Sequence, residues 1–372
     1  MKGRIVFMEQ KRLKVGIIGC GGIANGKHMP SIKAVNMSDM VAFCDLIEER
    51  AVKAAKEYGV PGAKVYTDYK ELLADPEIDV VHVCTPNRSH AEISIDALHA
   101  GKHVMCEKPM AKCAADARLM VKAAQETGKK LTIGYQHRHK ASAQYLKSII
   151  GRGDLGDMYY AEALAVRRRG TPNWGVFLNE YEQGGGPLID IGTHALDLTL
   201  WTMNNYEPEM VVGTKYHKLA PHANSANAWG PWDPEKFTVE DSAFGFVRMK
   251  NGATIYLESS WALNTLDVHE AKTILCGDKG GADMMGEGGA LRINGERFGK
   301  TYVTEPGLGA GGVAFYDGET VSAADLEAKM WIAHVLDDNA PLITKPEQAI
   351  VVTKILEAIY TSSATGKPVY FD

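Results

Sequence analysis

The stretch LKVGIIGCGGIA, residues 13–24, decides the fold of this chain. Its first seven residues form an apolar run that ends in glycine, which is typical of a strand buried on both faces of a sheet. The pattern Gly19-x-Gly21-x-x-Ala24 follows directly. Gly19 allows a tight turn, Gly21 lets the backbone approach a pyrophosphate, and Ala24 keeps the following helix close to the strand. The stretch therefore predicts a strand, turn and helix that bind a dinucleotide.

An acidic residue stands where such a site needs one. Asp45 ends the next apolar run, 21 residues beyond Ala24. A carboxylate there accepts hydrogen bonds from the ribose hydroxyls and repels a 2′-phosphate, so it predicts NAD rather than NADP. A tight turn with a surface aspartate is the alternative. On the first interpretation the cofactor-binding residues here are Gly19, Gly21, Gly22, Ile23, Ala24 and Asp45.

The first third of the chain alternates strand and helix patterns, which predicts a parallel, doubly wound α/β sheet with right-handed crossovers. We expect this nucleotide-binding domain over residues 13–135, after a tail at residues 1–12. The expected strands are Leu13–Gly19, Met40–Asp45, Val80–Thr85, His103–Glu107 and Leu131–Gly134, and the expected helices are Ile47–Tyr58, His90–Ala100 and Ala114–Thr127.

The pattern changes in residues 136–372. Tyr159–Arg169 alternates as a strand, and Asn251-Gly252 and Asn294-Gly295 each lie beside alternating runs, which favours hairpins with type I′ turns. Ala323–Leu336 and Glu347–Thr365 are expected helices. We expect a second, α+β domain with a mostly antiparallel sheet.

Polar residues follow three of the expected parallel strands, and ligands of such sheets bind outside the carboxyl ends of the strands. Lys108, in Glu107-Lys108-Pro109, is well placed to reach a nicotinamide ribose or a substrate hydroxyl, although a surface turn is the more common situation for such a tripeptide. The expected cofactor contacts at these ends are Thr85, Pro86, Asn87, His90, Glu107, Lys108 and Gln136.

The stretch GGGPLIDIGTHALDLTLW, residues 184–201, is an apolar helix pattern interrupted by Asp190, His194 and Asp197. The spacing i, i+4 and i+7 stacks these three on one helix face. That face is either solvated or lines a pocket.

Taken together, G-x-G-x-x-A, C-T-P-N-x-x-H, E-K-P and G-G-G-x-L-x-D-x-G-x-H-x-x-D resemble the glucose-fructose oxidoreductase, inositol dehydrogenase and rhizopine-catabolism (Gfo/Idh/MocA) family, from Leu13 to Phe371. The resemblance implies an N-terminal Rossmann domain and a C-terminal domain with a large open sheet, through which a homodimer or homotetramer forms. It also implies that substrate binds between the domains.

The resemblance places Lys108, Asp190 and His194 as the catalytic residues. Imidazole titrates near neutrality and suits His194 as the proton acceptor from a substrate hydroxyl. Lys108 would polarise the oxygen, and Asp190 would bond a hydroxyl or orient the imidazole. Asp197 is expected to be structural.

Aromatic faces and forked donors suit a polyhydroxylated ring, so Tyr135, Arg138, Arg168 and Trp174 join the catalytic three as expected substrate contacts. The arginines at 167–169 alternatively suit a phosphate or carboxylate, and we expect Arg167 to be solvated. The activity expected is NAD-dependent oxidation of a ring alcohol of a sugar, glycoside or inositol. A glycoside lyase or hydrolase that retains NAD, and a non-catalytic NAD-binding regulator, are the alternatives.

The composition excludes several other classes. The 372 residues carry a formal net charge of −5 and no membrane-length apolar run, so we expect neither a nucleic acid nor a membrane partner. The six cysteines form no C-x-x-C pair, and no ligand cluster predicts a metal. Reduced thiols and the lack of a secretory signal pattern favour a cytoplasmic location.

Overall fold

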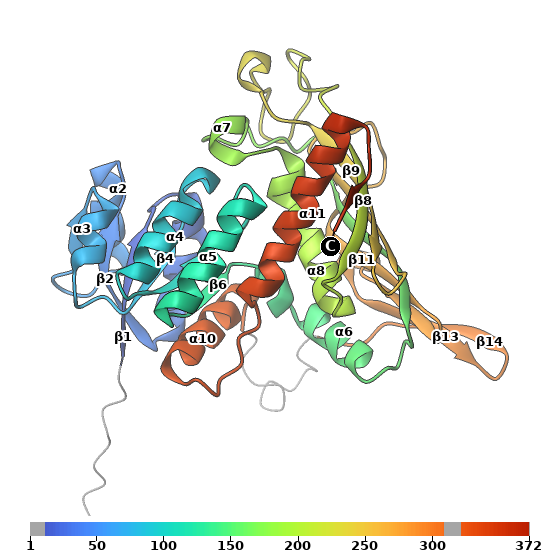
Figure 1. Ribbon diagram of the computed structural model, residues 1–372, viewed down its shortest axis with the longest axis horizontal. Coiled ribbons are helices and arrows are strands. Elements are labelled where there is room, and N and C mark those ends of the chain that lie inside the picture. The colour runs from blue at the N-terminus through green and yellow to red at the C-terminus, as the bar shows by residue number, and fades with distance from the viewer. Residues whose placement is uncertain (1–11, 309–320, 372) are drawn as a thin grey trace, which may run out of the picture.

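The computed structural model describes residues 12–308 and 321–371, so the predicted tail lies outside the described residues except for Arg12. Two sheets make up the molecule, with helices between and around them (Figure 1). The predicted combination of a parallel doubly wound sheet with a mostly antiparallel one is confirmed.

The first sheet has six parallel strands in the order β3-β2-β1-β4-β5-β6. Its strands are β1 (Leu13–Ile18), β2 (Ser38–Cys44), β3 (Lys64–Tyr66), β4 (Val80–Val83), β5 (His103–Cys106) and β6 (Leu131–Ile133). The helical segments are η1 (Ala24–His28), α1 (Met29–Val35), α2 (Glu48–Tyr58), α3 (Tyr69–Ala74), η2 (Asn87–Ser89), α4 (His90–His99) and α5 (Ala114–Thr127). Sequence patterns missed β3 and α3, which are too short for periodicity to reveal.

The strand order reverses between β1 and β4, and ligands of open α/β sheets bind at such a point. Gly19 follows β1 here with φ +90°. A Cβ on Gly19 would lie 2.7 Å from the carbonyl oxygen of Cys84, at the end of β4. Only glycine therefore lets the two strand ends approach this closely.

The second sheet has nine strands in the order β14-β13-β12-β11-β7-β10-β9-β8-β15, and all its pairs are antiparallel except β7 with β10. Helices α8 and α11 lie on the same side of it, toward the first sheet (Figure 1). The strands are β7 (Met158–Val166), β8 (Pro208–Tyr216), β9 (Ser242–Met249), β10 (Thr254–Ser260), β11 (His269–Gly277), β12 (Gly280–Asp283), β13 (Arg292–Arg297), β14 (Lys300–Thr304) and β15 (Val369–Tyr370). The helical segments are η3 (Gln136–His139), α6 (Ala141–Gly151), α7 (Glu180–Gln183), η4 (Leu188–Gly192), α8 (Thr193–Met203), η5 (Pro234–Lys236), η6 (Glu287–Gly289), α10 (Ala323–Leu336) and α11 (Pro346–Thr365).

Both predicted hairpin turns need correction. Asn251-Gly252 does join β9 to β10, but Gly252 is the loop residue with positive φ, at +88°. The amide of Met249 bonds the carbonyl of Ala253, so the loop has three residues and is not a type I′ turn. Asn294-Gly295 lies inside β13 because its ladder with β12 holds both residues extended. The chain turns instead at Phe298-Gly299, where φ is +52° and +69°.

Helix α10, which precedes α11, returns to the first sheet. Its Trp331 and Ile332 are buried in the same apolar cluster as Val15 and Phe43. Glu327 on α10 also forms a buried ion pair with Lys27 at 2.8 Å. The nucleotide-binding half is therefore completed by residues far beyond its predicted end at 135. In residues 12–308 and 321–371, no helix is long and apolar enough to cross a membrane.

Candidate active site

The glycine turn leaves an open cradle at the end of β1. A Cβ added at Gly21 or Gly22 would meet no atom within 4 Å, and the side chain of Ile23 is exposed. The helix that begins here directs free backbone N–H groups toward that space, as a pyrophosphate requires. Ala24 is fully buried, so it serves helix packing as predicted and does not offer a side chain to a ligand.

Asp45 sits at the end of β2 and braces the same turn. Its carboxylate accepts hydrogen bonds from the amide of Cys20 at 2.8 Å and the amide of Ile47 at 2.9 Å. Each oxygen keeps a second acceptor position for a ribose hydroxyl. The open glycine turn and this half-buried carboxylate fit a dinucleotide.

The predicted contacts after β4 divide into two groups. Thr85, Pro86 and Asn87 lie at least partly exposed at the rim, and Asn87 donates to the carbonyl of Gln183 at 3.0 Å. His90 is buried instead. Its ring nitrogens lie 2.8 and 2.9 Å from the carbonyl oxygens of Pro109 and Thr85. His90 therefore ties the loops after β4 and β5 together, and the expectation that it contacts a cofactor is replaced by this support role.

Glu107 is likewise a support. Its carboxylate is buried, and it bonds Lys27 Nζ and His28 Nε2, each at 2.7 Å, and the amide of Lys108 at 3.1 Å. Burial would raise the pKa of the Glu107 carboxyl, but the Lys27 ammonium and the His28 ring hold it well below its ordinary value. A permanent carboxylate thus fixes the backbone of Lys108. Glu107 was expected to contact the cofactor, but its buried side chain instead supports Lys108.

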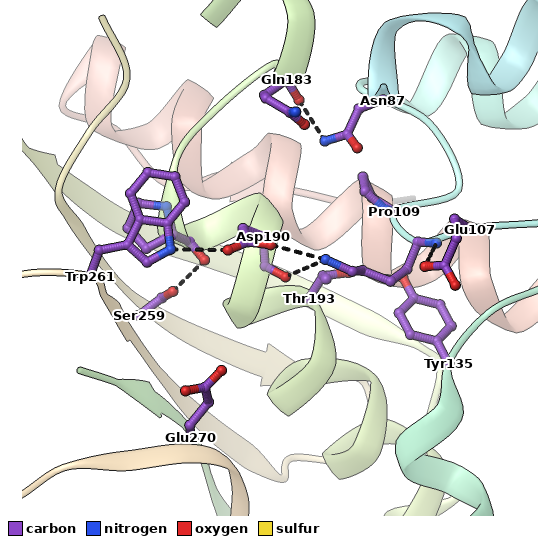
Figure 2. A network of polar contacts seen from close by, with 12 residues as sticks. Asn87, Glu107, Pro109, Tyr135, Gln183, Asp190, Thr193, Ser259, Trp261 and Glu270 are labelled. Carbon is purple, nitrogen blue, oxygen red and sulfur yellow. Dashed lines mark hydrogen bonds and ion pairs between the residues drawn. The ribbon is translucent and has the colours of Figure 1, made fainter. Parts of the chain in front are cut away.

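Lys108 and Asp190 are in contact at the site. Figure 2 shows Asp190 between Trp261 and Glu107. Lys108 Nζ donates to Oδ1 of Asp190 at 3.0 Å and to its carbonyl oxygen at 2.9 Å. The other carboxylate oxygen accepts from Nε1 of Trp261 at 3.1 Å. An ammonium has three N–H donors, so one remains for a ligand after these contacts with described residues.

The segment that carries Asp190 begins as a π-helical turn, η4, before continuing as α8. It starts at Leu188 and not at Gly184 as predicted, because Gly184–Gly186 pack against neighbouring elements. A Cβ at Gly186 would lie 2.2 Å from the carbonyl oxygen of Glu240, whose carboxylate accepts the amides of Gly186 and Leu188. Single π turns are frequent at functional sites.

His194 lies one turn after Asp190. Its Nδ1 is buried with no hydrogen-bond partner among the described residues. Its ring centroid lies 4.7 Å from that of His137 and 6.4 Å from that of Tyr135. Burial, the charge of Lys108 and the neighbouring His137 hold the pKa of His194 well below its ordinary value. The ring is therefore neutral at physiological pH and able to accept a proton.

Asp197 has the structural role expected for it and does not join Asp190 and His194 in the site. It is fully buried and forms a bidentate pair with Arg138, which also bonds the carbonyl of Ile343. Tyr135 is fully buried too, and its hydroxyl bonds Thr193. The expectation that Arg138 and Tyr135 touch substrate is replaced by a role in packing, because both are enclosed by protein.

The other predicted substrate contacts are open to solvent. Arg168 is exposed beyond the end of β7, and Trp174 is 49% exposed. Arg167 was expected to be solvated, but its Nε bonds Glu270 at 2.7 Å and its guanidinium lies over the ring of Trp229. Gln136 is half-buried in η3.

Sequence reasoning missed three groups near the site, namely His137, the buried Lys27–Glu327 pair, and the aromatic residues Phe177, Trp229 and Trp261. His137 lies between Gln136 and Arg138 in the sequence, and nothing in the pattern distinguishes it from these neighbours. Trp229 lies in a loop rich in tryptophan, asparagine and proline, and that composition is the one signal that pointed to it. Among residues 12–308 and 321–371, no group of three or more histidine, cysteine or acidic side chains is arranged to hold a metal ion.

Two family models match the chain that carries this site. Residues 13–135 match the oxidoreductase family with an NAD-binding Rossmann fold, and residues 143–283 match the Gfo/Idh/MocA C-terminal domain. The chain belongs to the Gfo/Idh/MocA family. It is thus an NAD-binding oxidoreductase, and the resemblance seen in its motifs is confirmed.

Relatives within the Gfo/Idh/MocA family carry names of sugar and polyol enzymes. The chain is 36% identical over 359 residues to the D-glucoside 3-dehydrogenase of Escherichia coli, which covers 96% of this chain and 97% of that one. It is 33% identical over 193 residues to an inositol 2-dehydrogenase of Salmonella typhimurium, covering 52% and 55%. The fold matches the aldose-aldose oxidoreductase of Caulobacter crescentus with a TM-score of 0.78 at 23% identity, over 97% of this chain and all of that one.

Proposed function

We propose that this protein is an NAD-dependent dehydrogenase that oxidises a ring secondary alcohol of a sugar, with a glycoside as the preferred substrate class. The observation that carries the proposal is the Lys108–Asp190 pair, whose Nζ–Oδ1 distance is 3.0 Å, beside the half-buried neutral ring of His194. A lysine, a carboxylate and a neutral imidazole at the edge of a dinucleotide fold are what alcohol oxidation needs.

NAD, when bound, supplies the hydride acceptor. His194 takes the hydroxyl proton, because its depressed pKa keeps it unprotonated. Lys108 donates its remaining N–H to the substrate oxygen and stabilises the negative charge that develops there. Asp190 fixes the ammonium of Lys108 through two contacts and is itself held by Trp261.

The glycoside preference rests on similarity across the whole chain. The relative that covers 96% of this chain is named for D-glucosides, whereas the inositol dehydrogenases cover about half of it.

The test is the absorbance of NADH at 340 nm with NAD and NADP in parallel. The panel holds methyl and aryl glucosides, free sugars, inositols, sugar acids and sugar phosphates. A rise with NAD and glucosides supports the proposal. Glycosidic cleavage without net NADH would indicate the NAD-retaining lyase or hydrolase, and tight NAD binding without turnover of any polyol would indicate the regulator.

We also propose that the protein forms a homodimer or homotetramer through the outer face of the nine-stranded sheet. That face carries Tyr256, 44% exposed, with Tyr160 and Phe246 at ring-centroid distances of 5.9 and 5.4 Å. Exposed aromatic clusters of this kind mark association surfaces. Light scattering tests this: the wild type is expected to exceed the mass of one chain and Tyr256→Glu to lower it, whereas a wild-type monomer at all concentrations would refute it.

A further inference from the structure

Two tryptophans from distant parts of the chain meet on the surface. Trp174 and Trp229 are 49% and 47% exposed, and their ring centroids lie 4.9 Å apart at an interplanar angle of 89°. Large aromatic side chains gathered in the open are uncommon on soluble proteins unless they bind something. Nothing in the chemistry assigned to Lys108, Asp190 and His194 requires this pair.

Hydrogen bonds hold the pair in a fixed geometry. Asn173 Nδ2 donates to the carbonyl of Trp229 at 2.7 Å and to that of Gly230 at 3.1 Å. Asn227 bonds both the amide and the carbonyl of Thr171, each at 2.9 Å. The loop that carries Trp229 is therefore pinned to the segment that carries Trp174. A surface prepared in this way loses little conformational freedom when a ligand binds.

The pair is continuous with the catalytic residues but stands outside them. Phe177 lies 5.9 Å from Trp174 and 6.5 Å from Trp261 between ring centroids. Trp261 in turn donates to Asp190. A chain of contacts thus runs from Asp190 through Trp261 and Phe177 to Trp174, which places the tryptophan pair beside the catalytic residues.

Polar donors accompany the aromatic faces. The Arg167 guanidinium lies 5.5 Å from the centre of the Trp229 ring, held there by Glu270. Arg168 is exposed beside it in the chain. Apolar faces next to guanidinium groups match the C–H faces and hydroxyls of a pyranose.

We propose that Trp174 and Trp229 form a second subsite, which binds the ring attached to the anomeric oxygen of a glycoside while the first ring is oxidised at Lys108 and His194. The proposal rests on the proposed function, because it takes the position of the reacting ring from that function. It makes the preferred substrate a two-ring glycoside, either a disaccharide or an aryl glucoside.

The experiment compares methyl glucoside with phenyl glucoside and a glucosyl disaccharide of the same anomeric configuration. Trp174→Ala, Trp229→Ala and Trp174→Phe are assayed beside Tyr370→Ala, which removes an exposed ring on β15. We expect each alanine variant to lower the ratio of two-ring to methyl-glucoside kcat/KM about tenfold, mainly through KM. Trp174→Phe should lose less, and Tyr370→Ala and the kcat for methyl glucoside should change less than about twofold.

An unchanged ratio, or equal losses on one-ring and two-ring substrates, would overturn the subsite. If the wild type oxidises no glycoside, the proposed function fails, and calorimetric titration of the same disaccharide into the NAD-saturated protein decides the subsite separately. Disaccharide binding that is weakened by Trp174→Ala would support the subsite, and absence of disaccharide binding to the wild type would refute it.

Discussion

Asp197 and Arg138 form a fully buried bidentate ion pair, with distances of 2.6 Å from Nη2 to Oδ1 and 2.9 Å from Nε to Oδ2. The pair links η3, directly after the last strand of the nucleotide-binding sheet, to α8, which carries His194. Burial raises the pKa of Asp197 against the lowering effect of Arg138, so the charge of Asp197 depends on its partner. The position of the helix relative to the nucleotide-binding sheet therefore rests partly on this pair.

Arg138→Met should destabilise the protein by about 3–5 kcal/mol, because it leaves the buried carboxylate of Asp197 without its cation. The double variant Arg138→Met/Asp197→Leu should recover part of the loss. Arg152→Met is the matched control, since Arg152 pairs with Asp154 at 2.6 Å on the surface. That change should cost about 0–1 kcal/mol. Denaturant unfolding measures all three, and similar losses for Arg138→Met and Arg152→Met would contradict the assignment.

Lys108→Met should lower kcat/KM for the sugar by about 10²–10³-fold, because the donor that stabilises the developing charge is removed. Lys112→Met, four residues on, is the control: Lys112 Nζ bonds the carbonyl of Tyr181 on the surface. We expect near-normal turnover from it. Initial rates at 340 nm compare the two, with NAD binding by calorimetry to show that the fold is intact. Near-normal turnover by Lys108→Met would show that Lys108 does not stabilise the developing charge.

His194→Asn should reduce kcat by about 10²–10⁴-fold, as loss of a general base does. The wild-type pH profile carries a second expectation. Because burial and the charge of Lys108 depress the pKa of His194, the acid limb of kcat/KM should fall below pH 6.5. Stopped assays from pH 4.5 to 9 measure it, with the exposed His222→Asn as control. An acid limb of kcat/KM with its midpoint at or above pH 6.5 would indicate that a group other than His194 is the base.

Asp45→Asn should reduce the preference for NAD over NADP by about fivefold, because two unit charges 4 Å apart repel by about 1 kcal/mol in water. The amide keeps the size of the side chain, so the turn at Cys20 should persist. Glu71→Gln, an exposed change of the same charge in the neighbouring helix α3, is the control. Kinetic constants with both cofactors decide it, and an unchanged preference would show that Asp45 only braces the turn.

Acid should destabilise the protein partly through His139. Burial, with the charges of Lys27 and Arg138, lowers the pKa of His139 to about 4, whereas an unfolded histidine titrates near 6.5. The unfolded chain therefore binds the proton first, and the stability given by the neutral ring is complete above pH 6.5 and lost as pH falls toward 4. The fall in Tm between pH 7 and 5 should be smaller in His139→Gln than in the wild type or in the exposed-site variant His99→Gln. Equal falls in all three would contradict it.

The predicted residues that lie exposed or half-buried around the Lys108–Asp190 pair are those with a short-range signature. The turn from Gly19 to Ala24, the Glu107-Lys108-Pro109 tripeptide and the Asp190/His194 spacing all depend on neighbours within a few positions. Lys108 and Asp190, 82 residues apart, were brought together by the family resemblance, and the structure places them in contact.

The errors share one physical cause. Tyr135, Arg138, His90 and Glu107 all follow or precede strand ends, where open and buried side chains share the same local pattern. Their directions are set by distant partners, such as Asp197 for Arg138 and Lys27 for Glu107. Trp229 was missed because it lies in a loop whose position depends on hydrogen bonds to residues 171–173.

The core of the N-terminal sheet can be completed only after helix α10 has been synthesised. Trp331 and Ile332 belong to the same core as β1, and Glu327 pairs with the buried Lys27, as Glu107 does. On a ribosome adding ~5–20 residues per second, the nucleotide-binding strands wait on the order of 10 s for this helix. During that interval the cover over Leu13 and Val15 is missing and Lys27 has only Glu107. A chain that ended before residue 323 would therefore lack Trp331, Ile332 and Glu327, and the apolar core on β1 would stay incomplete although the glycine turn is present.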